Sequence, residues 1–153
     1  MSTMLQPVET FNPVARSYVV RLEDELRKLP QYKCVVRHYF VEGLYVREIE
    51  IPAGVALVGY IHTQPCITTI SKGTILISDG ESSVELSAPY TTTVAPGTKK
   101  AGYALTDVIW SDAYVNVDNE HDIDKLENRL TANTHEEYLL KTEKFLQLEN
   151  IES

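Results

Sequence analysis

The sequence predicts a mainly β protein of one domain, in which a β-barrel is flanked by an N-terminal helix and a C-terminal helical extension. Three observations support this fold class. Apolar residues recur at helical steps near the N-terminus, short β-rich segments fill the middle of the chain, and helical spacing returns after residue 118. The length of 153 residues is that of one ordinary domain with its own core.

The first helix is predicted to begin at Asn12-Pro13, because asparagine is a favoured N-cap and proline a favoured first helical residue. It should end before Pro30, which disfavours helical backbone in the preceding residue. Glu23 and Arg27 lie one turn apart and form a favourable pair. The residues of its apolar stripe are Val19, Leu22, Leu26 and Leu29. Residues 1–32 are therefore assigned to an N-terminal arm and helix.

The middle of the chain is rich in β-branched and aromatic residues, which are typical of strands. The strand-like segments are 35–40, 44–51, 56–62, 67–78, 83–87, 90–95 and 107–117. Between or within them lie the turn signals Glu42-Gly43, Pro52-Ala53-Gly54, Lys72-Gly73, Asp79-Gly80 and Pro96-Gly97. No helical segment separates these strands as a parallel α/β sheet would require, so residues 33–117 are predicted to form a barrel or sandwich.

Residues 118–153 are predicted to form an acidic helical extension. Ile123, Leu126 and Leu130 indicate a short helix, and the segment 134–137 has the capping-box pattern that opens a second one. The stripe of that second helix comprises Tyr138, Leu139, Thr142, Phe145 and Leu146. This stripe must be buried either on the barrel or on a neighbouring subunit.

Charge and composition exclude several classes of function. The net charge is −8, and residues 112–153 contribute 11 acidic and 4 basic residues. Binding of nucleic acid through phosphate contacts requires a basic surface, so it is not expected. No apolar run is long enough to span a bilayer, and the N-terminal residues lack the pattern of a signal peptide. Cys34 and Cys66 are expected to be free thiols in a reducing cytosol.

The most informative motif is a spacing pattern made by Gly54, Tyr60, His62, Cys66 and Gly73. It resembles the first cupin motif, in which a glycine, two histidines, a glutamate and a closing glycine surround a metal. Three blocks carry the resemblance in order: RHYFVEGLYVREIEIPAG (37–54), GYIHTQPCITTISKGTI (59–75) and APYTTTVAPGTKKAGYALTDVIW (88–110). Over residues 37–117 the chain resembles a small cupin-like family of bacterial and bacteriophage proteins, which implies a cupin-type β-barrel or jelly roll.

The chain departs from the cupin pattern at the metal ligands. Only the second histidine of the first motif, His62, is present, and Cys66 replaces the glutamate. The histidine of the second motif falls near Ala101, where this chain has none, and members of the cupin-like family often have histidine where Cys66 stands. Some members also have one where Leu105 stands.

Tyr60 and His62 are two residues apart, so on a strand both side chains point to one face, and we expect this to be the barrel interior. With Cys66, His62 forms a candidate site for a divalent transition metal such as Zn, Fe, Mn or Ni, with tyrosine or water completing it. The alternatives are no cofactor at all, with His62 as a hydrogen-bonded interior histidine and Cys66 as a small buried residue. Cys66 as a nucleophile would need His62 as its base.

The other candidate pocket residues are Lys99, Lys100, Tyr103 and Trp110. The two lysines follow a turn, so they either receive an anionic group at the barrel mouth or belong to a solvated turn. The two aromatic residues either stack on a sugar or base or serve as packing. Arg47 is predicted to form a structural ion pair with Glu48 or Glu50.

Three functions remain open. We favour a non-enzymatic binding or assembly protein that forms a homo-oligomer or larger assembly, and the family resemblance extends this to an accessory or structural role in a bacteriophage virion. The alternatives are a metal-dependent enzyme of the isomerase or dioxygenase type and a sensor of a small polar ligand. The expected location is the cytoplasm of a bacterial host or the virion.

Overall fold

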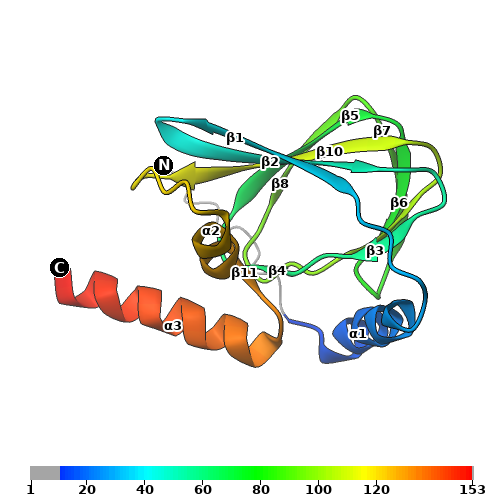
Figure 1. Cartoon of the computed structure of the whole chain (residues 1–153). Helices are drawn as coiled ribbons and strands as arrows, with labels where there is room; N and C mark the ends of the chain where they lie inside the picture. The colour runs from blue at the N-terminus through cyan, green and yellow to red at the C-terminus, as the bar shows by residue number, and fades with distance from the viewer. Residues whose placement is uncertain (1–10, 153) are drawn as a thin grey trace, which may run out of the picture.

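The computed structural model describes residues 11–152, with side chains described through residue 143. Two antiparallel sheets face each other and form a barrel, with helix α1 (Pro13–Arg27) beneath one end and helices α2 (Ile123–Leu130) and α3 (His135–Glu152) at the other (Figure 1). The mainly β fold with flanking helices is the one predicted from the sequence. Its two-sheet antiparallel barrel agrees with the predicted cupin-type architecture.

The strands follow one another closely along the chain. Their bounds are β1 (Val35–Val41), β2 (Gly43–Ile51), β3 (Ala56–Val58), β4 (Ile61–His62), β5 (Cys66–Lys72), β6 (Thr74–Ser78), β7 (Ser83–Ser87), β8 (Tyr90–Val94), β9 (Ala101–Ala104), β10 (Val108–Asn116) and β11 (Thr131–Ala132). The five-stranded sheet has the order β1-β2-β10-β5-β8, and the four-stranded sheet has the order β3-β9-β6-β7. A small third sheet pairs β11 with β4.

Two predicted strands are each divided between sheets. The segment 56–62 forms β3, which pairs with β9, and β4, which pairs with β11. The segment 67–78 forms β5 in the large sheet and β6 in the small one, with Gly73 at the turn between them. The short strand β9 was not predicted, because its sequence AGYA contains no β-branched residue.

Helix α1 begins as predicted and buries only part of the predicted stripe. The side chain of Asn12 accepts hydrogen bonds from two amides of the first turn, at 3.1 Å each. Ala15 and Val19 are buried against the barrel, where the helix contacts β3 and β9. Leu22 and Leu29 of the predicted stripe are exposed, so the predicted stripe was wrong at these two positions.

Two glycines fix how the elements meet. Gly73 has φ +86°, and a Cβ placed there would lie 2.0 Å from the backbone oxygen of Asp107. Gly80 has φ +93°, and its Cβ would lie 1.9 Å from the backbone oxygen of Ala15 in α1. Both turns therefore require glycine for conformation and for space. Helix α1 can rest on the β6–β7 turn only because Gly80 has no side chain.

The buried apolar residues form two clusters. One lies between the two sheets and comprises Ile51, Ile70, Ile75, Ile77, Ala104 and Val108. The other joins the inner face of the large sheet to α2 and comprises Tyr45, Cys66, Val94, Tyr114, Leu126 and Leu130. The first cluster fills one end of the barrel and the second closes the other, which leaves a polar space between them.

The C-terminal extension is docked by α2 and β11. Asp122 caps α2, and Thr131 of β11 pairs with His62 of β4. At the start of α3, the hydroxyl of Thr134 accepts a hydrogen bond from the amide of Glu137 at 3.1 Å, as the capping pattern predicts. From there α3 projects away from the barrel (Figure 1).

The predicted stripe of α3 is only partly visible. Leu139 is exposed, while Phe145 and Leu146 lie outside the residues whose side chains the structure describes. The burial of this stripe, on the barrel or on another subunit, stays a prediction. Within residues 11–152, no helix combines the length and the apolar character that a membrane span requires.

Candidate functional site

A cavity of about 220 Å³ lies inside the barrel. Both sheets contribute apolar side chains to its wall, including Ile49, Ile51, Ile75 and Leu86. The polar and charged residues that line it include Arg47, Tyr60, His62, Thr68, Tyr90, Thr92, Thr98, Lys100 and Asp112. A largely apolar wall with a few convergent polar groups is typical of small-molecule sites.

The register of the large sheet explains why these polar groups meet. Residues directly opposite one another in antiparallel strands point to the same face. One row of such partners crosses all five strands and consists of His38, Arg47, Asp112, Thr68 and Thr92. Four of the five line the cavity, the exception being His38 on the edge strand β1. We call this set the interior row.

Asp112 is the buried carboxylate of the interior row. The hydroxyl of Thr68 and the indole nitrogen of Trp110 both donate to its Oδ1 atom, the latter at 3.0 Å. No donor to Oδ2 is found among the described residues. The sequence analysis missed Asp112, although strand alternation places it on the face of Trp110.

His62 lies near Asp112, and two neighbouring side chains contact one of its ring nitrogens. Its Nδ1 atom is 3.3 Å from the hydroxyl of Tyr114 and 3.8 Å from the sulfur of Cys66. Burial lowers the pKa of His62; the negative charge of Asp112 opposes this shift, and the positive charges of Lys100 and Arg47 reinforce it. The imidazole is therefore neutral at neutral pH.

Cys66 is buried at the start of β5. Burial, reinforced by the charge of Asp112, raises the pKa of its thiol to about 12. The thiol consequently stays protonated at neutral pH, whereas nucleophilic attack requires the thiolate. The arrangement of His62 and Cys66 does not activate the sulfur as a nucleophile.

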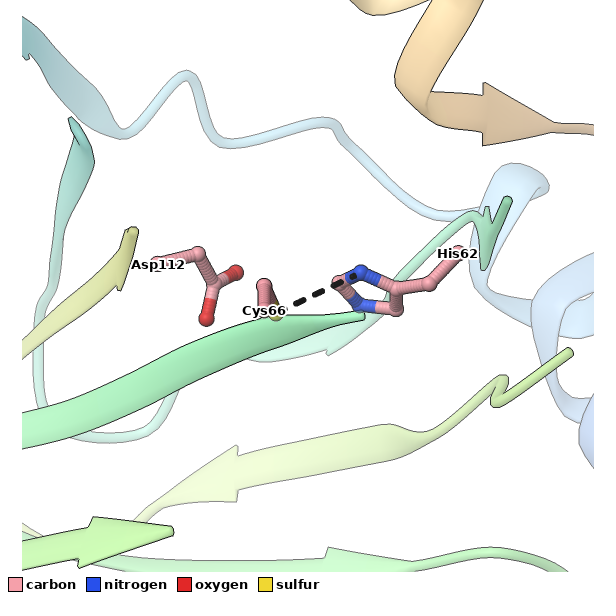
Figure 2. Close-up of side chains that lie close together, drawn as sticks. All are labelled: His62, Cys66 and Asp112. Carbon is pink, nitrogen blue, oxygen red and sulfur yellow. Dashed lines mark hydrogen bonds between the residues drawn. The ribbon is translucent and has the colours of Figure 1, made fainter. Parts of the chain in front are cut away.

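His62, Cys66 and Asp112 together form a candidate metal centre. Their nearest donor atoms all lie within 4.8 Å of one another, and Figure 2 shows the three side chains gathered around a common point. Imidazole nitrogen, sulfur and carboxylate oxygen are all zinc ligands, and a tetrahedral zinc site separates sulfur and nitrogen by about 3.6 Å. The observed 3.8 Å between Sγ and Nδ1 fits that geometry.

Of the remaining predicted pocket residues, some line the cavity and others do not. Tyr60, Lys100 and Trp110 line the cavity with His62, although Tyr60 lies between strands and is half exposed. Tyr103 is exposed on the outer face of β9 and does not line the cavity.

Lys99 also lies outside the cavity, and it does not belong to a solvated turn. Its side chain is 1% exposed, and its Nζ atom lies 3.1 Å from Oε2 of Glu23 and 2.9 Å from the backbone oxygen of Gly59. It therefore joins α1 to the connection between β3 and β4. The neighbouring Lys100 points the other way because successive residues of an extended segment face opposite sides.

The predicted ion pair of Arg47 was wrong. Glu48 and Glu50 point to the outer face of β2, where Arg37 of β1 lies 3.4 and 3.0 Å from their carboxylates. Arg47 instead points inward with Ile49 and Ile51 and lines the cavity.

No protein-family model matches the sequence, and no curated protein matches it. Solved structures do. A cupin-2 domain protein from Shewanella frigidimarina is 10% identical, with a TM-score of 0.46 over 62% of this chain and 92% of that one. A cupin superfamily protein from Desulfitobacterium hafniense is 11% identical, with a TM-score of 0.48 over 71% and 93%. An acetylacetone dioxygenase from Acinetobacter johnsonii is 12% identical, with a TM-score of 0.47 over 60% and 74%. At these identities no activity is transferred to this chain.

Proposed function

We propose that this chain is a non-enzymatic binding module whose barrel receives a small polar ligand. The observation that carries the proposal is the 220 Å³ cavity, in which polar side chains from several strands point inward from an apolar wall. A binding role is favoured over nucleophilic catalysis because the buried Cys66 thiol, with a pKa of about 12, stays protonated.

The single tryptophan of the chain, Trp110, lines the cavity and gives a direct readout. Small polar compounds that enter the barrel should change its fluorescence and raise the melting temperature, because a ligand that binds only the folded state stabilises it. Compounds should be screened by both measurements, because a ligand of the cavity should change both.

A pair of variants on β8 localises the binding. Thr92 points into the cavity, whereas its neighbour Thr93 is exposed on the outer face. Thr92→Phe should fill the cavity and abolish the response of Trp110, while Thr93→Phe should leave it unchanged. Equal responses in both variants would place the ligand outside the barrel and refute the proposal.

A metal-dependent function is the second candidate, and the cluster of His62, Cys66 and Asp112 favours it. These three residues would hold a divalent ion such as zinc, which supplies Lewis-acid chemistry when bound. The nearby positive charges of Arg47 and Lys100 oppose a cation at this place. That opposition is why the metal centre ranks second.

Cobalt(II) titration tests the metal centre, since sulfur coordination produces an intense near-ultraviolet band. Cys66→Ser should remove that band if the centre binds metal. Cys34→Ser is the matched control, because Cys34 is the other free cysteine and lies outside the cluster. A band that survives Cys66→Ser, or no band in the unaltered protein, would eliminate this candidate.

Self-association and a role in a phage virion are further parts of the proposal. Their support is the predicted apolar stripe of α3 and the family resemblance of the sequence. Light scattering before and after removal of residues 134–153 tests the first: a monomer in both samples would exclude α3 as an interface.

A further inference from the structure

The cavity contains a cation that has no partner among the residues that the structure describes. Arg47 lies between His38 and Asp112 in the interior row, with its backbone directly opposite that of Asp112. No hydrogen bond or ion pair joins its guanidinium to any described residue. Asp112 instead accepts from Thr68 and Trp110, and the acidic neighbours of Arg47 are bound to Arg37 on the outer face.

A second cation, Lys100, lines the same cavity. Its ammonium group makes no hydrogen bond or ion pair with the residues that the structure describes. Among the charged side chains that line the cavity, two cations therefore face one carboxylate, Asp112. Arg47 and Lys100 are both half-buried, so their charges are less well solvated than at the surface, and this cavity favours an anionic occupant.

The size and the wall of the cavity restrict the occupant further. A volume of 220 Å³ corresponds to about seven water molecules. Ile51, Ile75 and Leu86 offer apolar surface and no hydrogen-bonding side chain. Hydroxyl groups of a sugar that face this part of the wall would find no hydrogen-bond partner there, whereas the apolar body of a short organic acid needs none.

We propose that the ligand is a small organic monocarboxylate. Its carboxylate pairs with the guanidinium of Arg47, assisted by Lys100, and its apolar body lies against the isoleucines and Leu86. A planar guanidinium binds a carboxylate through two parallel hydrogen bonds, which gives both affinity and orientation. This inference rests on the proposed function, because it names the ligand class of the same cavity.

Matched acids and alcohols test the charge requirement on the unaltered protein. Benzoate is compared with benzyl alcohol, and hexanoate with 1-hexanol, by quenching of Trp110 fluorescence and by thermal shift. Hydrogen bonds to a charged group contribute about 1.5–3 kcal/mol, so at least one acid should bind roughly 10- to 100-fold more tightly than its alcohol.

A pair of arginine variants then tests whether Arg47 is the residue that binds the carboxylate. Arg47→Gln should remove most of the preference for the acid, so that the ratio of acid affinity to alcohol affinity falls toward one. Arg37→Gln is the matched control, because Arg37 lies on the neighbouring strand with its ion pairs on the outer face. Arg37→Gln should bind both compounds as the unaltered protein does. If Arg47→Gln binds benzoate or hexanoate as tightly as the unaltered protein, the assignment of Arg47 is wrong.

The outcomes separate this inference from the proposed function. If alcohols or other neutral compounds bind in the cavity as tightly as the acids, only the carboxylate assignment fails. If no compound of either kind changes Trp110 fluorescence or stability, the proposed function fails with it. The comparison of acid with alcohol remains decisive if Arg47→Gln does not fold.

Discussion

Replacement of Lys99 by methionine is expected to weaken the attachment of α1 to the barrel. Methionine retains the apolar stem of lysine and removes the ammonium group that binds Glu23 and the backbone oxygen of Gly59. The ammonium is almost fully enclosed, so water cannot take its place without a rearrangement. Burial lowers the pKa of Lys99, and the hydrogen bond and negative charge of Glu23 oppose this shift.

The magnitude follows from what the partners lose. Breaking a buried ion pair on one side costs about 3–5 kcal/mol, and an unsatisfied buried carbonyl costs about 1–3 kcal/mol. The carboxylate of Glu23 is 17% exposed and keeps Arg27 at 3.3 Å, so it stays partly stabilised. We therefore expect Lys99→Met to reduce the free energy of unfolding by about 2–3 kcal/mol.

Urea unfolding, followed by circular dichroism, measures this change. The double variant Lys99→Met, Glu23→Met removes both charges, and it should recover at least about 1 kcal/mol relative to Lys99→Met alone. A loss below about 0.5 kcal/mol in the single variant, or no recovery in the double variant, would show that the pair does not hold the helix.

Three further predictions concern stability. Gly80→Ala should lower the free energy of unfolding by more than about 2 kcal/mol, because its Cβ would meet the backbone of α1. Gly43 also has a positive φ but has open space around it, so Gly43→Ala should lower it by only about 1 kcal/mol. Thermal melts of the two variants test this difference. Ile70→Ala, at a fully buried position, should cost about 3–4 kcal/mol in urea unfolding, and Ile67→Ala, which is half exposed, less than about 1 kcal/mol. Hydrogen bonds from a backbone amide and a lysine lower the pKa of Glu137, so its contribution to stability is present above the pKa of the unfolded chain and is lost as the pH falls through the folded pKa. The difference in urea midpoint between about pH 7 and pH 3 should therefore be smaller in Glu137→Gln than in the unaltered protein. An unchanged difference would refute this prediction.

Local patterns in the sequence predicted the elements well. Asn12-Pro13 begins α1 as expected, and the turn glycines separate the strands where they were predicted. These features depend on a few neighbouring residues, so they can be read without knowledge of the fold. The division of 56–62 into two strands was missed because it depends on pairing with β9 and β11, which lie far along the chain.

The candidate site was predicted only in part, since its members are brought together by register. His62 and Cys66 are close in sequence and formed one motif, whereas Asp112 reaches them from β10. Lys99 and Lys100 are indistinguishable in sequence, and only the docking of α1 through Glu23 decides which one is enclosed. Such long-range partners leave no local signal.

The interior row affects how readily the strands of the large sheet separate from one another. Its five members come one from each strand of the large sheet, so a ligand held by the row ties together strands whose residues are far apart in the chain. Its binding energy would oppose separation of any one of these strands from its neighbours. A bound ligand should therefore slow amide hydrogen exchange in β2, β10, β5 and β8 together, rather than around one loop.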